Sequence, residues 1–96
     1  METADGKITF YIKKNPFVVG SSESFSDGVI ANKKFSKAHF CIENSHDVCF
    51  IMDLNSNNGT VVNDKELMPG VSMELIEFDR IKVGKTELIF REKEGL

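Results

Sequence analysis

The chain has 96 residues, a formal net charge of −3 and a pI of about 5.3, and 41% of its residues are hydrophobic. This length indicates one domain, and the composition is that of an ordinary globular protein. The acidic balance argues against a general nucleic-acid binder, which needs a basic face. No apolar run approaches the length of a membrane span, and no signal-peptide pattern opens the sequence. We therefore expect neither a direct nucleic-acid partner nor a membrane partner.

The two cysteines, Cys41 and Cys49, are too few for a disulfide scaffold. They fall on neighbouring predicted strands, so a bridge is geometrically conceivable, but two free thiols in an intracellular reducing compartment are favoured. A zinc site would need further ligands at suitable spacing, and His39 and His46 are the only histidines. We predict no metal site and no cofactor.

Short apolar and β-branched runs follow one another along the chain, separated by turn-forming residues. We predict a flexible N-terminal tail over residues 1–6, whose Met fits a genuine N-terminus, one domain over residues 7–91, and a C-terminal tail over residues 92–96. The strands predicted within the domain are 7–12, 17–20, 29–31, 38–43, 48–52, 60–62, 72–77, 81–84 and 86–91. Residues 72–77 fit a strand or one helical turn, and a strand is preferred. Many short strands without sustained helical periodicity indicate a β-sandwich.

One polar segment between two predicted strands, residues 53–63, reads Asp-Leu-Asn-Ser-Asn-Asn-Gly-Thr-Val-Val-Asn. Asn and Gly tolerate positive φ, and Asn side chains hydrogen-bond their own backbone, so the segment predicts a sharp loop. A polar loop held between two strands suits ligand binding, whereas an ordinary structural turn is the alternative interpretation.

Three segments together resemble the forkhead-associated (FHA) domain, a β-sandwich module that binds phosphothreonine. They are Val18-Val19-Gly20, the Ser-x-x-His motif of residues 36–39, and residues 53–63; residues 78–84 also fit the family's Asp-x-Ile-x-x-Gly motif. The resemblance covers about residues 16–90. It implies an all-β sandwich of two twisted, mainly antiparallel sheets, with the ligand loops at one end.

The resemblance also implies roles for particular side chains. Ser36 would hydrogen-bond the phosphate, Lys37 would add positive charge, and Asn57 and Asn58 would contact the phosphothreonine and the peptide backbone. Four residues would hold the loops in shape: Gly20, His39, Gly59 and Asn63. Other interpretations stay open, since Ser36 fits a turn cap and the lysines near it fit a solvated loop.

One position departs from the family pattern: Ser21 stands where the family has an Arg after Gly20. A guanidinium gives a permanent charge and a rigid fork of donors, whereas Ser gives one neutral hydroxyl. Losing a charged hydrogen bond of about 1.5–3 kcal/mol weakens binding roughly 10- to 100-fold. The only arginines, Arg80 and Arg91, lie in the last third of the chain. We therefore expect a degenerate phosphothreonine pocket.

Two functional hypotheses follow. The preferred one is a homodimerising, non-catalytic interaction module of a DNA-damage or chromatin scaffold, placed in the nucleus by family analogy, which self-associates through residues 8–12 or residues 67–73. The alternative is a functional phosphothreonine-binding module that recruits a phosphorylated partner protein. An enzyme is not expected, because Ser36, His39 and Cys41 lack the acid partner of a catalytic triad.

Overall fold

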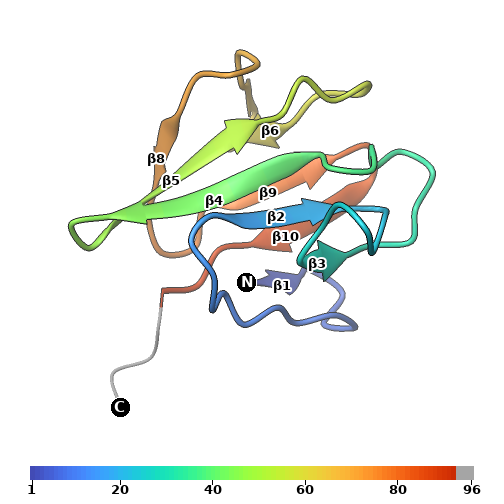
Figure 1. The fold of residues 1–96 in the computed structure, drawn as a ribbon. Coiled ribbons are helices and arrows are strands. Elements are labelled where there is room, and N and C mark those ends of the chain that lie inside the picture. Colours follow the sequence, from blue (N-terminus) through green and yellow to red (C-terminus); the bar gives the residue numbers. More distant parts are fainter. Residues whose placement is uncertain (93–96) are drawn as a thin grey trace.

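The computed structural model describes residues 1–92, and that part of the chain contains strands and turns but no helix (Figure 1). The strands described there pack as two five-stranded sheets. Their bounds are β1 Glu2–Thr3, β2 Phe17–Gly20, β3 Gly28–Val29, β4 Phe40–Ser45, β5 Val48–Asp53, β6 Val61–Val62, β7 Lys65–Glu66, β8 Met73–Leu75, β9 Arg80–Val83 and β10 Thr86–Ile89. The predicted all-β sandwich is confirmed.

The two sheets have the strand orders β1-β10-β9-β6-β7 and β3-β2-β4-β5-β8. Each pairing between these strands is antiparallel except that of β2 with the short β3, which is parallel. The β4–β5 register runs from Phe40↔Asp53 to Ser45↔Val48. Because of this register, the beginning of β4 and the end of β5 lie at the same end of the sandwich.

The core lies between the sheets and is filled by alternate residues of the longer strands. In β4, Phe40 and Ile42 are buried while Cys41 between them is half-buried, as the two-residue period of a strand requires. Full burial of a large apolar side chain stabilises the fold by roughly 1.5–3 kcal/mol. The buried apolar residues are Met1, Phe17, Val19, Ile30, Phe35, Phe40, Ile42, Ile51, Val62, Leu67, Leu75, Ile81, Val83, Leu88 and Phe90.

The first residues of the chain correct the prediction of a flexible tail over residues 1–6. Glu2 and Thr3 form β1, which pairs with Ile89 and Leu88 of β10, and Met1 is buried in the core. A two-residue strand is too short to produce an alternating pattern, so its place in the sheet comes from pairing with β10 rather than from local sequence.

Residues 7–12 correct a second prediction, because they form an extended segment rather than a regular strand. A single bridge joins Thr9 to Glu2, although Phe10 N–H also donates to the Met1 carbonyl oxygen at 2.7 Å. Ile8, Phe10 and Ile12 pack against the core from partly buried positions, whereas Tyr11 is exposed. The two-residue apolar period therefore reports that alternate side chains face the core. It does not report a full hydrogen-bond ladder.

The second half of the chain agrees with the predicted strands except at Lys65 and Glu66, which form the unpredicted strand β7 by pairing with β6. Residues 73–75 form β8, so the preference for a strand over a helical turn is confirmed there. Residues 93–96 lie outside the described residues, and of the predicted C-terminal tail over 92–96 only Glu92 is described. Its backbone N–H donates to the Glu77 carboxylate at 2.6 Å.

Candidate functional site

Three loops meet toward the right side of Figure 1. They are the β2–β3 loop (residues 21–27), the β3–β4 loop (residues 30–39) and the β5–β6 loop (residues 54–60). The first follows the end of β2, the second precedes the start of β4, and the third follows the end of β5. Since β2, β4 and β5 are adjacent antiparallel strands, these three positions fall at one end of the sheet. We call the surface they form the recognition end.

Ser36 and His39 join the β3–β4 loop to the β5–β6 loop. The Ser36 hydroxyl oxygen accepts the backbone N–H of Asn57 at 3.0 Å. His39 is fully buried; its Nδ1 accepts the Ser36 N–H at 3.0 Å, and its Nε2 lies 2.8 Å from the Gly59 carbonyl oxygen. With Nδ1 as an acceptor, Nε2 carries the proton and donates to Gly59. His39 is therefore a structural bridge that fixes the spacing of the two loops.

Asp53 anchors the base of the β5–β6 loop from inside the protein. Its carboxylate accepts the Ser56 hydroxyl at 2.6 Å, the Ser56 N–H at 3.0 Å and the Thr60 hydroxyl at 2.6 Å. The Ser56 hydroxyl oxygen in turn accepts the Gly59 N–H at 2.9 Å. Burial acts to raise the pKa of Asp53, but the hydrogen bonds from Ser56 and Thr60 outweigh it and hold the pKa below its ordinary value of 3.8.

Gly20 lets the β2–β3 loop approach the β3–β4 loop. A Cβ at Gly20 would lie 2.2 Å from the Lys37 carbonyl oxygen, so a side chain cannot fit there. Beyond it, the Ser21 N–H donates to the Ser36 carbonyl oxygen at 2.9 Å, and the Ser22 N–H to that of Lys37 at 3.4 Å. Ser21 thus lies beside Ser36 through its backbone, and its half-buried side chain is part of the recognition end.

Asn58 and Asn63 have different surroundings. The Asn58 side-chain amide donates to the Lys34 carbonyl oxygen at 2.9 Å, so it ties the β5–β6 loop to the β3–β4 loop. Asn63 lies in the β6–β7 turn with a φ of 49°, and it bonds Asp79 at 2.9 Å and the Arg80 N–H at 3.0 Å. The structure therefore brings Asn58 to the recognition end, whereas Asn63 fastens the turn to the start of β9.

The recognition end carries charges of both signs: three lysines in the β3–β4 loop, and Glu23 and Asp27 in the β2–β3 loop. Lys33, Lys34 and Lys37 are exposed, and within residues 1–92 none of them forms an ion pair. Arg80 pairs with Glu87, and Arg91 pairs with Glu2 at 3.6 Å and Glu77 at 3.2 Å, all on or beside the other sheet. The cations available to an anion at the three loops are thus lysines.

The sequence profile of the FHA domain family matches residues 17–84, a span that contains all three loops. The chain belongs to the FHA domain family. Within the family profile lie the predicted site residues Ser21, Ser36, Lys37, Asn57 and Asn58, and the predicted loop-shaping residues Gly20, His39, Gly59 and Asn63.

Known proteins resemble this FHA domain in sequence and in fold. It is 39% identical over 54 residues to Protein FraH of Nostoc sp.; the match covers 56% of the chain but only 19% of that longer relative. One solved structure, from a structural and functional analysis of phosphothreonine-dependent FHA domain interactions, has a TM-score of 0.82 and 26% identity, covering 97% of this chain and 94% of the other. The FhaA FHA domain complexed with the intracellular domain of Rv3910 has a TM-score of 0.81 and 26% identity, covering 92% and 93%.

Sequence reasoning missed the residues that support the FHA loops from below. Ser56 and Thr60 hydrogen-bond to Asp53. The spacing of the polar residues in 53–63 was the sequence signal that could have indicated these contacts. Phe35 is buried and packs at a tilt against His39, with ring centroids 5.2 Å apart, although it lies in a loop rich in lysines. The pairing of Phe25 with Lys37 had no signal in the sequence, because the two residues lie on different loops.

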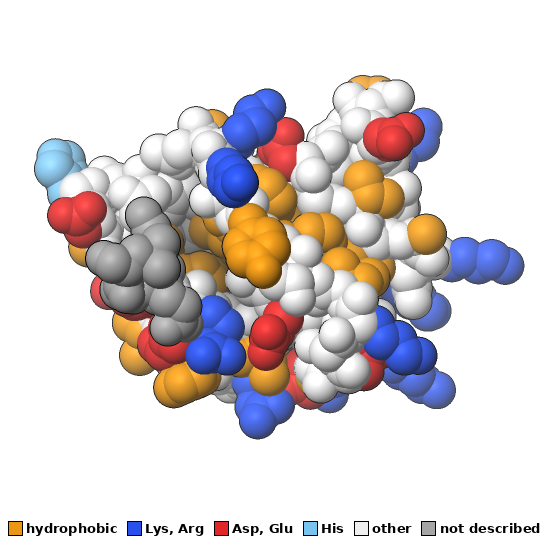
Figure 2. Space-filling view, turned by 90° about the horizontal axis from the view of Figure 1, so that it is seen from below, with side chains coloured by type: hydrophobic (Ala, Val, Ile, Leu, Met, Phe, Trp, Pro, Cys, Tyr) orange, Lys and Arg blue, Asp and Glu red, His pale blue; other side chains and the backbone are white. Residues whose placement is uncertain are grey.

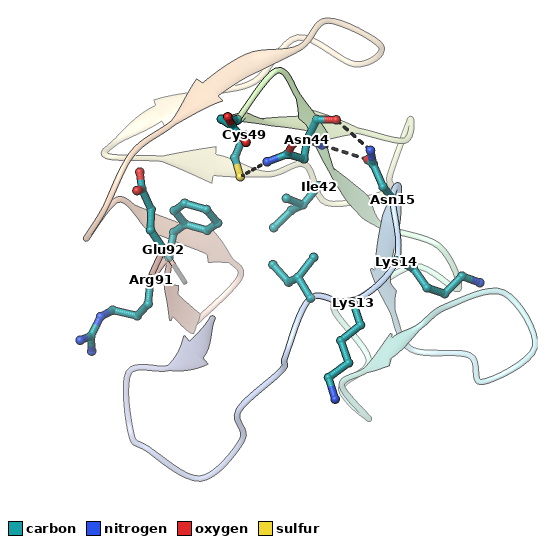
Figure 3. Close-up of a pocket in the computed structure, with 11 residues that line it drawn as sticks. Lys13, Lys14, Asn15, Ile42, Asn44, Cys49, Arg91 and Glu92 are labelled. Atoms are coloured by element: carbon teal, nitrogen blue, oxygen red, sulfur yellow. Dashed lines mark hydrogen bonds between the residues drawn. The ribbon is translucent and has the colours of Figure 1, made fainter. Parts of the chain in front are cut away.

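A hollow of about 520 Å³ lies at the end of the FHA sandwich opposite the recognition end (Figure 3). Its lining includes Asn44 near the end of β4 and Cys49 near the start of β5, which are the strand ends away from the recognition end. The Asn15 side-chain amide donates to the Asn44 carbonyl oxygen at 2.8 Å and accepts the Asn44 backbone N–H at 2.9 Å. Ile42 points into the hollow. None of the predicted site residues lines it.

Residues 1–92 contain neither a metal cluster nor a membrane-spanning helix. No group of three or more His, Cys, Asp and Glu side chains in that range could hold a metal ion. The same range contains no helix that is long and apolar enough to span a membrane.

Proposed function

We propose that this FHA domain is a non-catalytic interaction module that binds a phosphothreonine-containing segment of a partner protein at its recognition end. The observation that carries the proposal is the hydrogen bond from Asn57 N–H to the Ser36 hydroxyl, which locks two loops together at 3.0 Å. With the His39 bridge behind it, the surface is rigid before any ligand arrives. A preorganised surface loses less conformational entropy on binding, which favours affinity.

The chemistry of the recognition end suits a phosphate ester. A phosphothreonine carries about −1.5 to −2 charges and three strong acceptor oxygens at neutral pH. The hydroxyls of Ser21 and Ser36 and the exposed Asn57 amide are neutral donors, and Lys37 is an exposed cation. One structural relative comes from an analysis of phosphothreonine-dependent FHA domain interactions, which supports this assignment.

We further propose that the phosphate is held weakly, in what we call a degenerate pocket. Ser21 supplies a hydroxyl where the family pattern has a guanidinium, and Arg80 and Arg91 are engaged in ion pairs with glutamates. Lysine provides a point charge without the planar fork of arginine. The affinity should therefore be roughly 10- to 100-fold below that of the same surface with an arginine at position 21.

Isothermal titration with a phosphothreonine peptide library tests this function. We expect weak binding of selected phosphopeptides, no binding of their unphosphorylated forms, and loss of binding in Ser36→Ala. Ser21→Arg should tighten binding by roughly 10- to 100-fold, because it restores a charge-assisted hydrogen bond. A native domain that binds no phosphopeptide, or one whose binding is unchanged in Ser36→Ala, would contradict the proposal.

Self-association is the second candidate function, and one observation favours it. Figure 2 shows apolar side chains gathered on the face seen from below, the side along which residues 7–16 run in Figure 1. Tyr11 in this segment is 75% exposed. The roles in a DNA-damage or chromatin scaffold and in the nucleus stay predictions from family analogy. FraH comes from a bacterium and therefore adds no support to a nuclear assignment.

A further inference from the structure

Phe25 is a large aromatic side chain that packs against no core and remains 60% exposed. It lies in the β2–β3 loop, whose local hydrogen bonds present it to the outside. The Phe25 N–H donates to the Ser22 carbonyl oxygen at 3.1 Å, and the Ser24 N–H donates to the Ser22 hydroxyl at 3.3 Å. The loop is thus a closed turn that holds the ring at the surface, where burial gives it little stabilising value.

The same loop makes three hydrogen bonds to the backbone at Ser36 and Lys37. The Ser22 N–H and the Ser26 hydroxyl both donate to the Lys37 carbonyl oxygen, and the Ser21 N–H donates to the carbonyl oxygen of the preceding Ser36. Gly20 allows this close approach. The position of the Phe25 backbone relative to the Lys37 backbone is therefore fixed by hydrogen bonds between the two loops.

The two side chains use this relation to make a cation–π contact. The Lys37 ammonium nitrogen lies 5.8 Å from the centroid of the Phe25 ring, within the range of about 6 Å for such contacts. A lysine on an exposed loop ordinarily samples many rotamers. The ring limits that freedom and holds the ammonium beside the β2–β3 loop, within the recognition end.

We propose that Phe25 is a positioning residue that fixes the Lys37 ammonium as the cation of the phosphate site. This inference rests on the function proposed above and adds the means by which a surface without an arginine presents a fixed positive charge. Phe25 acts through Lys37 and need not touch the phosphate itself. Lys33 and Lys34, in the same loop as Lys37, have no aromatic partner within residues 1–92 and serve as unfixed charges.

A double-mutant cycle on the whole domain tests the proposal, with a selected phosphothreonine peptide and its unphosphorylated form as probes. We expect Phe25→Ala and Phe25→Leu to weaken phosphopeptide binding by about 2- to 5-fold, and Phe25→Trp to keep or improve it, because an indole is the best cation–π partner. Lys37→Met should weaken binding by roughly tenfold. In the Lys37→Met background, Phe25→Ala should cause no further loss.

Each other result has a definite meaning. An equal loss from Phe25→Ala with and without Lys37 would show that the ring contacts the peptide directly. Tighter binding in Phe25→Ala would show that the ring keeps the Lys37 ammonium away from the phosphate. Either result overturns the inference and leaves the proposed function standing. Absence of phosphate-dependent binding in the native domain overturns the proposed function and the inference together. Because Phe25 is exposed, the variants should fold, and unchanged thermal unfolding and circular dichroism provide the control.

Discussion

Asp53 is the residue on which the β5–β6 loop depends most directly. It is almost fully buried, yet it stays ionised at neutral pH because three hydrogen bonds from Ser56 and Thr60 satisfy its carboxylate. A buried charge without such partners would instead neutralise by shifting its pKa upward. The loop conformation and the ionisation of Asp53 therefore support each other.

Asp53→Asn should lower the free energy of unfolding by roughly 1.5–3 kcal/mol, because it weakens hydrogen bonds to a charged acceptor. The folded-state pKa of Asp53 lies below 3.8, so its stabilising contribution is complete above that pH and is lost as the pH falls through the folded value. Urea unfolding at pH 7 and at pH 3 measures both effects. The stability difference between native and variant should shrink at the lower pH, and a constant difference would contradict the assignment.

Gly20 is another single residue on which the site depends, because an added methyl group would separate two loops. Gly20→Ala should destabilise the domain by about 1–3 kcal/mol through overpacking against the Lys37 carbonyl, and it should also lower phosphopeptide affinity. Gly70→Ala is the matched control: its Cβ meets no heavy atom within 4 Å, so only the strain of its positive φ remains. Thermal unfolding and peptide titration of both variants test the prediction. Equal effects of the two changes on peptide binding would contradict it.

At the scale of secondary structure, β1 shows how a very short strand completes a sheet. It pairs with the edge of β10 through its two residues, and the buried side chains of Met1 and of Thr3 in β1 cover the core there. The neighbouring residues 7–12 then lie against this strand through the Thr9–Glu2 bridge. The edge of the sandwich thus depends on the first residues described.

Deletion of residues 1–3 should therefore destabilise the domain by about 2–4 kcal/mol, since it removes one buried large side chain and the pairing of β1 with β10. Chemical denaturation measures the change. Glu2→Gln is the control: it keeps the strand and removes only the exposed ion pair with Arg91, which should cost less than about 1 kcal/mol. An unchanged unfolding midpoint after the deletion would show that β1 contributes nothing to stability.

For the whole molecule, the apolar face seen in Figure 2 is the surface that a second copy would cover in a homodimer. A specific interface buries at least about 1,000 Å² in total, or about 500 Å² on each copy. That is a small share of the domain's 6288 Å² surface.

If the domain self-associates there, light scattering at high micromolar concentration should give about twice the monomer mass of 10.8 kDa. Tyr11→Ser should return the mass to that of a monomer, because it removes the 75% exposed aromatic side chain of the segment 7–16. Phe25→Ser, which changes an exposed aromatic residue on a different loop, is the control and should leave the dimer intact. A monomer at all concentrations would remove self-association as a function.

The sequence alone determined the fold class, most strands and the loops of the candidate site. Alternation in residues such as Phe40 and Ile42 reports burial directly, because side chains alternate across a strand. The polar residues of 53–63 likewise marked a turn, since Asn and Gly adopt conformations that other residues avoid. These signals are local, so neighbours along the chain are enough to produce them.

Only the tertiary structure decided how distant segments meet. β1 is a strand because β10 lies beside it, whereas residues 7–12 bond to the first residues of the chain through one isolated bridge and not through a regular ladder. Phe25 contacts Lys37 because two loops lie side by side, and His39 connects Ser36 in one loop to Gly59 in another. Such contacts depend on sheet register and loop closure, which are properties of the folded chain as a whole rather than of any short run of residues.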